Sequence, residues 1–274
     1  MALYIVPTPI GNLQDITERA VVVLRRVDFI IAEDSRYSQK LLNHFNIKKR
    51  IISHYRPKEE TQAEKILALL TGQDGALITD SGTPAISDPG FILIAKAIAR
   101  NIPVIPLPGP TAFVPALVAS GIDPRRFIFL GFPPRGRNDL HTFCKSLAPL
   151  PYTMVFYESP RRSEEFLRSA AAVFGARPFA LAKELSKKHE TIIRGRLDEW
   201  PQALKDQTIL GEIVIVIAGT GAKAHPVEPP PLLRSIEDVY VYFRERHGLG
   251  KNLLKKILMQ KKAKKAAKRG SDAG

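Results

Sequence analysis

Short apolar runs alternate with amphipathic stretches through the first part of the chain. The runs read as buried strands, and between them apolar residues recur at the helical period of three to four positions. We therefore expect strands at 3–6, 29–32, 51–54, 76–79 and 104–107, and helices at 17–26, 38–45, 59–71, 92–100 and 111–120. This strict alternation of strand and helix predicts a largely parallel sheet covered by helices.

The second part of the chain shows a related but less regular pattern. Strands are expected at 127–131, 153–157, 179–183, 190–194 and 212–218, with helices at 140–147, 163–173 and 197–205. The run at 190–194 leads directly into Gly195, Arg196 and Leu197, a sequence typical of an antiparallel hairpin. The second sheet is therefore predicted to be mixed.

A proline-rich stretch separates these two parts from a basic C-terminal tail. Prolines 226, 229, 230 and 231 oppose regular structure and indicate a linker. Helical patterns follow at 236–247 and 252–267. The predicted organisation is an N-terminal α/β domain at 1–115, a C-terminal α/β domain at 116–221, a linker at 222–231 and a helical tail at 232–274.

Composition narrows the class of protein. The 274 residues are 45% hydrophobic and 25% charged, which is ordinary for a globular protein. The single cysteine, Cys144, cannot form an internal disulfide and favours a reducing compartment. We see neither a signal-peptide pattern nor an apolar stretch near the ~20 residues of a membrane span. A cytoplasmic protein without a membrane partner is expected.

Positive charge is concentrated in the tail. The formal net charge is +14, and residues 232–274 hold 12 Lys/Arg against 4 Asp/Glu. Such a tail attracts polyanions by neutralising phosphates. Lys251, Lys255 and Lys256 flank the apolar positions of its helical pattern and are candidate RNA contacts. The alternative is a solvated tail that aids solubility, whereas a membrane-surface helix would need more bulky apolar residues.

Three loops rich in Gly and Pro follow predicted strands, at 6–12, 78–90 and 107–112. In α/β sheets ligands bind at the carboxyl ends of strands, so the loops suggest one shared small-molecule site. None has the G-x-G-x-x-G spacing of a dinucleotide fold or the ending of a P-loop. Each alone could be a structural turn, and Asp88 could cap the helix after Pro89.

Charged residues also follow several strands. Glu158, Arg161 and Arg162 come after one, and Lys183 with Glu184 after another. Carboxylates can act as proton acceptors, and guanidinium groups bind phosphates. The alternatives are a helix start at Pro160, a solvated hairpin, and, for Arg36 beside Asp34, a surface ion pair. No histidine has the spacing of a metal ligand, so we expect a metal-independent reaction.

Eight motifs in fixed order resemble the tetrapyrrole-methylase superfamily of S-adenosylmethionine (AdoMet) enzymes, and most closely its ribosomal RNA methyltransferases. They are LYIVPTPIGNLQDIT (3–17), AEDSR (32–36), TDSGTPAISDPG (79–90), PLPGPTA (106–112), GFPPR (131–135), FYESPRR (156–162), AKELSKKHE (182–190) and GEIVIVIAG (211–219). The resemblance implies two α/β domains with AdoMet in the cleft between them, and a homodimer.

The resemblance also implies particular residues. Carried over by motif position, the AdoMet contacts are Pro9, Ile10, Gly11, Gly82, Thr83, Ile86, Thr111, Ala112, Tyr157, Ala182 and Ile213. Many superfamily members have Gly-Asp-Pro where this chain has Gly82-Thr83-Pro84, and Asp80 is the substitute candidate for the missing carboxylate. Arg36, Arg161 and Arg162 join the tail lysines as candidate RNA contacts.

The implied reaction is methylation of a ribose 2′-hydroxyl, on a cytidine in the decoding centre of 16S rRNA, free or within the 30S subunit. A hydroxyl needs a proton acceptor during attack, and Glu158, Lys183 and Glu184 are the candidates, with Glu158 preferred. Two other functions stay open: a methylase of a tetrapyrrole or other small substrate, and a non-catalytic RNA-binding module in ribosome assembly.

Overall fold

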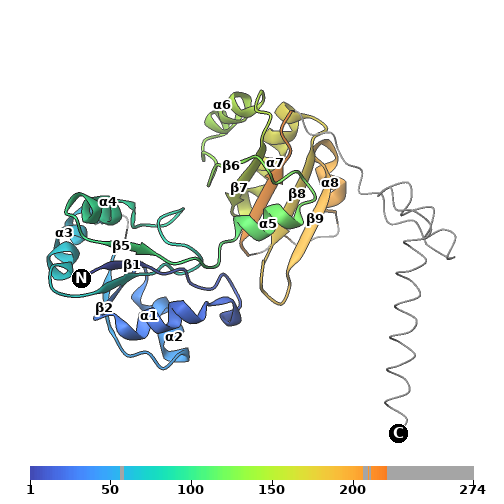
Figure 1. Cartoon of the computed structure of the whole chain (residues 1–274). Helices are drawn as coiled ribbons and strands as arrows, with labels where there is room; N and C mark the ends of the chain where they lie inside the picture. Colours follow the sequence, from blue (N-terminus) through green and yellow to red (C-terminus); the bar gives the residue numbers. More distant parts are fainter. Residues whose placement is uncertain (56–58, 206–208, 210, 221–274) are drawn as a thin grey trace, which may run out of the picture. The chain divides into compact units, whose positions relative to one another are not determined.

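The computed structural model describes residues 1–55, 59–205, 209 and 211–220 (Figure 1). Both sheets discussed below belong to one compact unit of the chain. The predicted linker at 222–231 and tail at 232–274, with Lys251, Lys255 and Lys256, lie outside the described residues. The boundary at 115/116 stays a prediction.

The first sheet is entirely parallel, as the alternating pattern predicts. Its five strands lie in the order β3-β2-β4-β1-β5. Tyr4 in β1, which lies between β4 and β5, pairs with Ala76 on one side and Ile105 on the other. The strands are β1 (Leu3–Ile5), β2 (Phe29–Ala32), β3 (Arg50–Ser53), β4 (Gly75–Leu77) and β5 (Val104–Pro106).

Helices cover both faces of this sheet because its strands are apolar on both sides. Tyr4 and Ile30 pack with α1 (Glu18–Arg26) and α2 (Ser35–His44). Leu3 and Ile31 face the other way, onto α3 (Glu59–Leu70) and α4 (Phe91–Ala99). The two buried layers account for why these strands read as continuous apolar runs.

The second sheet is mixed, as predicted. Its order is β6-β7-β10-β8-β9, and the pairing of β6 with β7 is parallel while the others are antiparallel. α5 (Phe113–Ala119) packs on one face. α6 (Arg137–Leu147) and α7 (Pro160–Phe174) pack on the other. The strands are β6 (Phe127–Phe129), β7 (Thr153–Glu158), β8 (Pro178–Lys183), β9 (Thr191–Arg196) and β10 (Ile213–Ile217).

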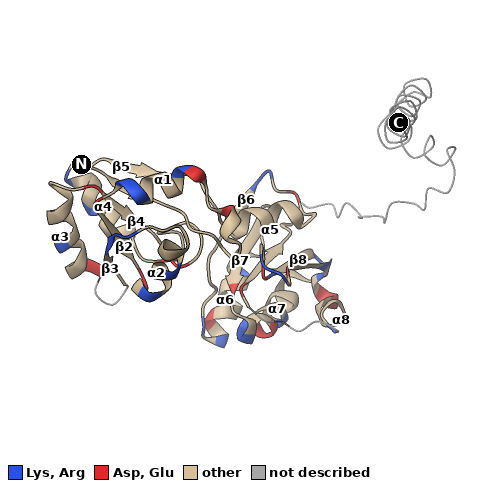
Figure 2. Cartoon of the chain, turned by 90° about the horizontal axis from the view of Figure 1, so that it is seen from below, with Lys and Arg blue, Asp and Glu red and all other residues tan. Residues whose placement is uncertain are grey.

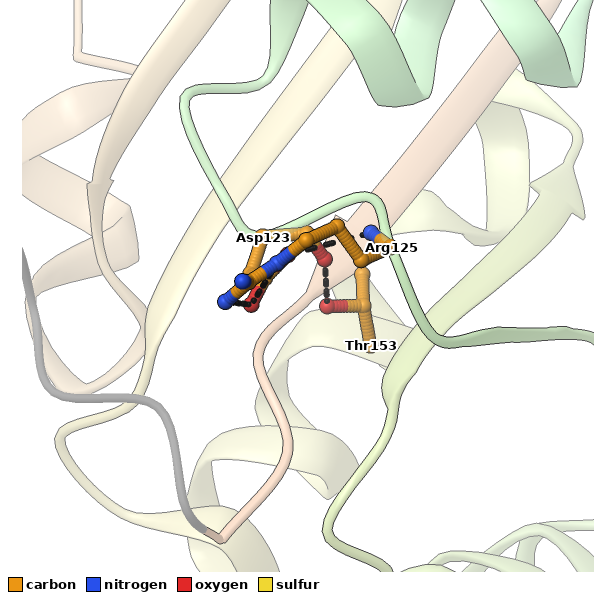
Figure 3. Close-up of polar contacts among 3 residues, drawn as sticks. All are labelled: Asp123, Arg125 and Thr153. Atoms are coloured by element: carbon orange, nitrogen blue, oxygen red, sulfur yellow. Dashed lines mark hydrogen bonds and ion pairs between the residues drawn. The ribbon is translucent and has the colours of Figure 1, made fainter.

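A polar cluster fixes the entry into β7 (Figure 3). The Thr153 hydroxyl donates to the Asp123 carbonyl at 2.7 Å. The Asp123 carboxylate accepts from Arg125, with Nη2 at 2.7 Å and the backbone N–H at 3.0 Å. The start of β7 is thereby tied to the segment that leads into β6.

Local sequence features account for two of the helix starts that differ from the sequence pattern. α2 begins at Ser35 rather than 38 because the Asp34 carboxylate accepts from the Arg36 N–H at 2.8 Å. α7 begins at Pro160 rather than 163, since proline is well suited to the first turn. The helix expected at 197–205 is a 3-10 turn, Leu197–Glu199, followed by the short α8 (Trp200–Ala203).

The start of α4 is capped by a distant residue instead of Asp88. Gly90 is the N-cap position, and Glu59 Oε1 accepts from the Gly90 N–H at 2.9 Å and the Ile92 N–H at 3.3 Å. The negative carboxylate also lies at the positive end of the helix dipole. Glu59 therefore links α3 to the loop that leads into α4.

Replacing Glu59 by alanine is expected to lower the free energy of unfolding by about 1–3 kcal/mol, because two N–H groups lose their acceptor. Denaturant-midpoint measurements check this. Glu60→Ala is the matched control, since the exposed Glu60 lies in the same helical turn and accepts from neither N–H group. Equal losses in the two variants would contradict the capping role.

Both signs of charge are interspersed over the helices and loops of the described residues (Figure 2). Several of these charges form surface ion pairs, such as Lys96 and Arg100 with Glu64 at 2.9 and 2.5 Å. Within the described part of the chain, no helix combines the length and apolarity that crossing a membrane requires.

Candidate functional site

The three Gly- and Pro-rich loops form one bonded unit. They follow β1, β4 and β5, which are neighbours in the sheet, so their carboxyl ends meet at one edge. The Thr8 N–H donates to the Gly82 carbonyl at 2.9 Å, and the Gly82 N–H donates back at 3.1 Å. The Thr8 hydroxyl adds a bond to the Thr79 carbonyl at 2.9 Å. Gly82 has φ +85°, which glycine adopts without strain.

The third loop, 107–112, contacts the other two loops through a hydrogen bond from Thr83 and a close approach of Gly109 to Pro7. Thr83 Oγ1 donates to the Pro110 carbonyl at 3.0 Å. A Cβ atom on Gly109 would lie 2.6 Å from the Cβ of Pro7, so no side chain fits there. Thr83 therefore has a structural partner at the position where many superfamily members carry aspartate.

A cavity of about 330 Å³ opens beside the loops, the last residues of β7 and the first residues of β10. This volume falls in the range of small-molecule sites. Of the predicted cofactor residues and proton acceptors, the lining contains Ile10, Gly82, Thr83, Ile86, Thr111, Ala112, Tyr157, Glu158 and Ile213. The structure places the others outside the lining: Pro9, Gly11, Asp80, Ala182, Lys183 and Glu184.

The charges in the lining have one sign. Asp88, Glu158 and Glu212 contribute carboxylates, and the described residues that line the cavity include no Lys, Arg or His. Much of the remaining wall is apolar, with Ile10, Phe113 and other hydrophobic side chains. The site therefore favours a ligand with an apolar body and positive charge over one that carries phosphates.

Glu158 is the most deeply buried of these acids. Its side chain is 1% exposed. Oε1 accepts from the Ser159 N–H at 2.8 Å, while Oε2 has no hydrogen-bond partner among the described residues. Burial raises the pKa of this carboxyl, and the Ser159 N–H and Arg162 partly oppose the shift. A buried carboxylate with a raised pKa is a stronger proton acceptor than an exposed one.

Arg162 holds the segment after β6 next to Glu158. Its Nη2 donates to the carbonyls of Pro134 at 2.6 Å and Pro133 at 3.4 Å. The same atom lies 3.6 Å from Glu158 Oε2. The Arg162 guanidinium group thus has its partners inside the protein, whereas the Arg161 side chain is exposed.

The other candidates have different surroundings. Lys187 Nζ lies 3.0 Å from Glu184 Oε1 and, through this bond, lowers the Glu184 pKa. Arg36 pairs with Asp34 at 3.2 Å on the surface. Burial raises the pKa of Asp80, whose Oδ1 has no hydrogen-bond partner among the described residues.

Several lining residues are not among the site residues predicted from the sequence: Ser81, Ser87, Asp88, Phe113, Phe132, Ser159, Pro160, Gly211, Glu212 and Val214. Phe132 and Glu212 lie within recognised motifs, but nothing in the motifs says which side chains face a cavity. As for a metal, the described residues contain no group of three or more His, Cys, Asp or Glu side chains that could hold one.

Comparison with known proteins defines the class. Residues 2–201 match the model of the Tetrapyrrole (Corrin/Porphyrin) Methylases. The chain belongs to this family and is a methyltransferase. Among solved structures, diphthine synthase has TM-score 0.62 at 13% identity, covering 80% of this chain and 90% of that one. Uroporphyrin-III-C-methyltransferase from Thermus thermophilus has TM-score 0.57 at 18% identity, covering 80% and 95%. At these identities the likeness concerns the fold alone.

Relatives with higher sequence identity carry a more particular name, Ribosomal RNA small subunit methyltransferase I. The protein of Micromonospora olivasterospora is 40% identical over 260 residues, 94% of this chain and 82% of that protein. The Hydrogenobaculum sp. protein is 46% identical over 222 residues, 80% and 96%. The Escherichia coli O157:H7 protein is 40% identical over 275 residues, 94% of each.

Proposed function

We propose that the chain is an AdoMet-dependent methyltransferase of the small-subunit ribosomal RNA, and that it methylates the ribose 2′-hydroxyl of a cytidine in the decoding centre. Relatives named for this RNA align over most of the chain at 40–46% identity. The observation that carries the cofactor assignment is the cavity itself, which is apolar and acidic and lacks basic side chains among its described lining residues.

AdoMet fits this lining. Its sulfonium and ammonium groups are positive and suit the carboxylates, while its adenosine suits the apolar walls. Ile10, Gly82, Thr83, Ile86, Thr111, Ala112, Tyr157 and Ile213 would hold it. When bound, AdoMet supplies an activated methyl group on a sulfonium leaving group. The chain's own contribution is to orient the acceptor and exclude water, and positioning of this kind is worth effective molarities of ~10⁵–10⁸ M.

Glu158 is the proposed proton acceptor because it is the most deeply buried of the three acids in the lining, Asp88, Glu158 and Glu212. Burial raises the pKa of Tyr157 to about 12, so its phenol stays protonated near neutral pH. Glu158 is buried, its Oε2 has no hydrogen-bond partner among the described residues, and it would take the proton of the ribose hydroxyl at that oxygen. Arg162, 3.6 Å away, favours the ionised form that the reaction needs.

Two measurements test the proposal. Isothermal titration should detect AdoMet binding and no binding of NAD⁺, since the charged residues of the lining are all acidic and repel phosphates. Labelled AdoMet should transfer methyl to 16S rRNA, supplied free or as 30S particles. Label in neither RNA substrate would refute the RNA assignment, and label on a tetrapyrrole instead would favour the small-molecule alternative.

We also propose a homodimer in the cytoplasm. Val118 and Val114 lie one turn apart on α5 and are 70% and 45% exposed, which leaves an apolar strip that a second copy could cover. Sedimentation velocity tests this: a monomer at micromolar concentration would contradict it.

A further inference from the structure

A large aromatic ring is exposed at the rim of the cavity. Phe132 follows β6, lines the cavity, and is 58% exposed. It ends a series of contacting rings in which Phe129 contacts Tyr157 with centroids 4.9 Å apart, and Tyr157 contacts Phe132 at 5.7 Å edge to face. A phenylalanine usually buries its ring, so exposure at a ligand site suggests a contact made on binding.

The backbone around Phe132 is firmly held. The Tyr157 N–H donates to the Gly131 carbonyl at 2.9 Å. Arg162 binds the carbonyls of Pro134 and Pro133 on the other side, at 2.6 and 3.4 Å. Two consecutive prolines further restrict the segment. The exposed ring is therefore preorganised, which lowers the entropic cost of binding.

Two exposed arginines lie close in the sequence to residues of the cavity lining. Arg135 lies three residues after Phe132, and Arg161 follows Pro160 of the lining. Among the described residues neither forms an ion pair, whereas Arg125 is paired with Asp123 at 2.7 Å. The segments that carry Phe132 and Pro160 thus each add an exposed positive charge, whereas the charged residues of the lining are acidic. This arrangement would hold phosphates outside while a single nucleoside enters.

We propose that Phe132 stacks against a base of single-stranded RNA at or beside the acceptor nucleotide, and that Arg135 and Arg161 contact the flanking phosphates. The inference rests on the proposed function and specifies how its substrate is held. Aromatic rings stack on bases of any sequence, and arginine binds phosphates bidentately. The ring and the two charges together fit an unpaired RNA segment better than a small macrocycle.

Phe132→Ala is expected to lower kcat/KM for 16S rRNA by about 5- to 150-fold, the range of one base stack, with a smaller effect on the Kd for AdoMet. Phe132→Trp should restore activity, because it keeps a stacking face. Wild-type activity in the alanine variant, or an equal loss of AdoMet affinity, would overturn the proposal. If the wild-type enzyme itself fails to methylate RNA, the proposed function fails instead.

The arginines are tested by salt dependence. For the Arg135→Gln/Arg161→Gln double variant, the slope of log K against log[salt] for a single-stranded RNA should fall by about 1.4, at about 0.7 per lost phosphate contact. Arg125→Gln is the matched control, since Asp123 already holds that guanidinium group (Figure 3). An unchanged slope in the double variant, or an equal change in the control, would overturn the phosphate contacts.

Discussion

Glu158→Gln is expected to lower kcat for RNA methylation by about 10²–10⁴-fold, the usual contribution of a positioned base, while the Kd for AdoMet stays the same. Glutamine keeps the shape of the side chain and can still accept from the Ser159 N–H, but it cannot take a proton. Single-turnover rates with saturating AdoMet, together with titration calorimetry, measure the two effects separately.

The controls for this variant come from neighbouring acids. Glu165→Gln makes the same chemical change on α7, where Glu165 pairs with Arg137 at 3.5 Å, outside the cavity lining. It should retain activity. Glu184→Gln tests the rival acid. A large loss in Glu184→Gln with full activity in Glu158→Gln would move the base to Glu184.

The pH dependence of both rate and stability follows from the burial of Glu158. Its pKa in the folded state is raised above the model-compound value of 4.5, so kcat should rise with pH through that raised value and then level off. The folded state binds the proton more tightly than the unfolded one, so this group's stabilisation is present at low pH and is lost as pH rises through the folded pKa. Glu158→Gln should lack both dependences, as urea unfolding at several pH values would show.

Gly109→Ala is expected to lower the rate of methyl transfer by about 10²-fold, the effect of a misplacement near 1 Å. The new Cβ atom would lie 2.6 Å from the Cβ and 2.9 Å from the Cγ of Pro7, and a proline ring cannot rotate away. The first and third loops must therefore separate, which displaces Ile10, Thr111 and Ala112 from the lining. Affinity for AdoMet should fall as well.

Gly72→Ala is the control for this change, because an added Cβ atom there has no neighbour within 4 Å. Thermal unfolding of both variants shows whether Gly109→Ala remains folded. A folded Gly109→Ala variant that binds AdoMet like the wild type would contradict the close coupling of the loops.

Much of the fold could be predicted from the sequence, because buried positions carry apolar residues at the period of a helix or as the continuous run of a buried strand. The apolar run at 29–32 coincides with β2, and the parallel order of the first sheet follows from the alternation of strands and helices. Helix starts were harder to place. The Asp34 cap adds a turn before Ser38, the predicted start of α2, and α4 takes its cap from Glu59, thirty-one residues before Gly90.

The site could be predicted less fully from the sequence, because its composition depends on strand order and turn geometry. The sequence shows three loops, but it does not show that β4, β1 and β5 are neighbours. Glu158 and Glu184 both come at strand ends and look equivalent. The structure separates them, since Glu184 has φ +52° and contacts Lys187, whereas Glu158 lines the cavity. Phe132 could not be told from a core residue without its exposed fraction.

The proposed mechanism requires that this cavity binds AdoMet and that Glu158 deprotonates a ribose hydroxyl beside it. Nucleoside analysis by mass spectrometry, after digestion of 16S rRNA treated with the enzyme and labelled AdoMet, tests it most directly. We expect label in 2′-O-methylcytidine with the wild type and a near-complete loss with Glu158→Gln. Label on a base, or equal 2′-O-methylation by the two proteins, would contradict it.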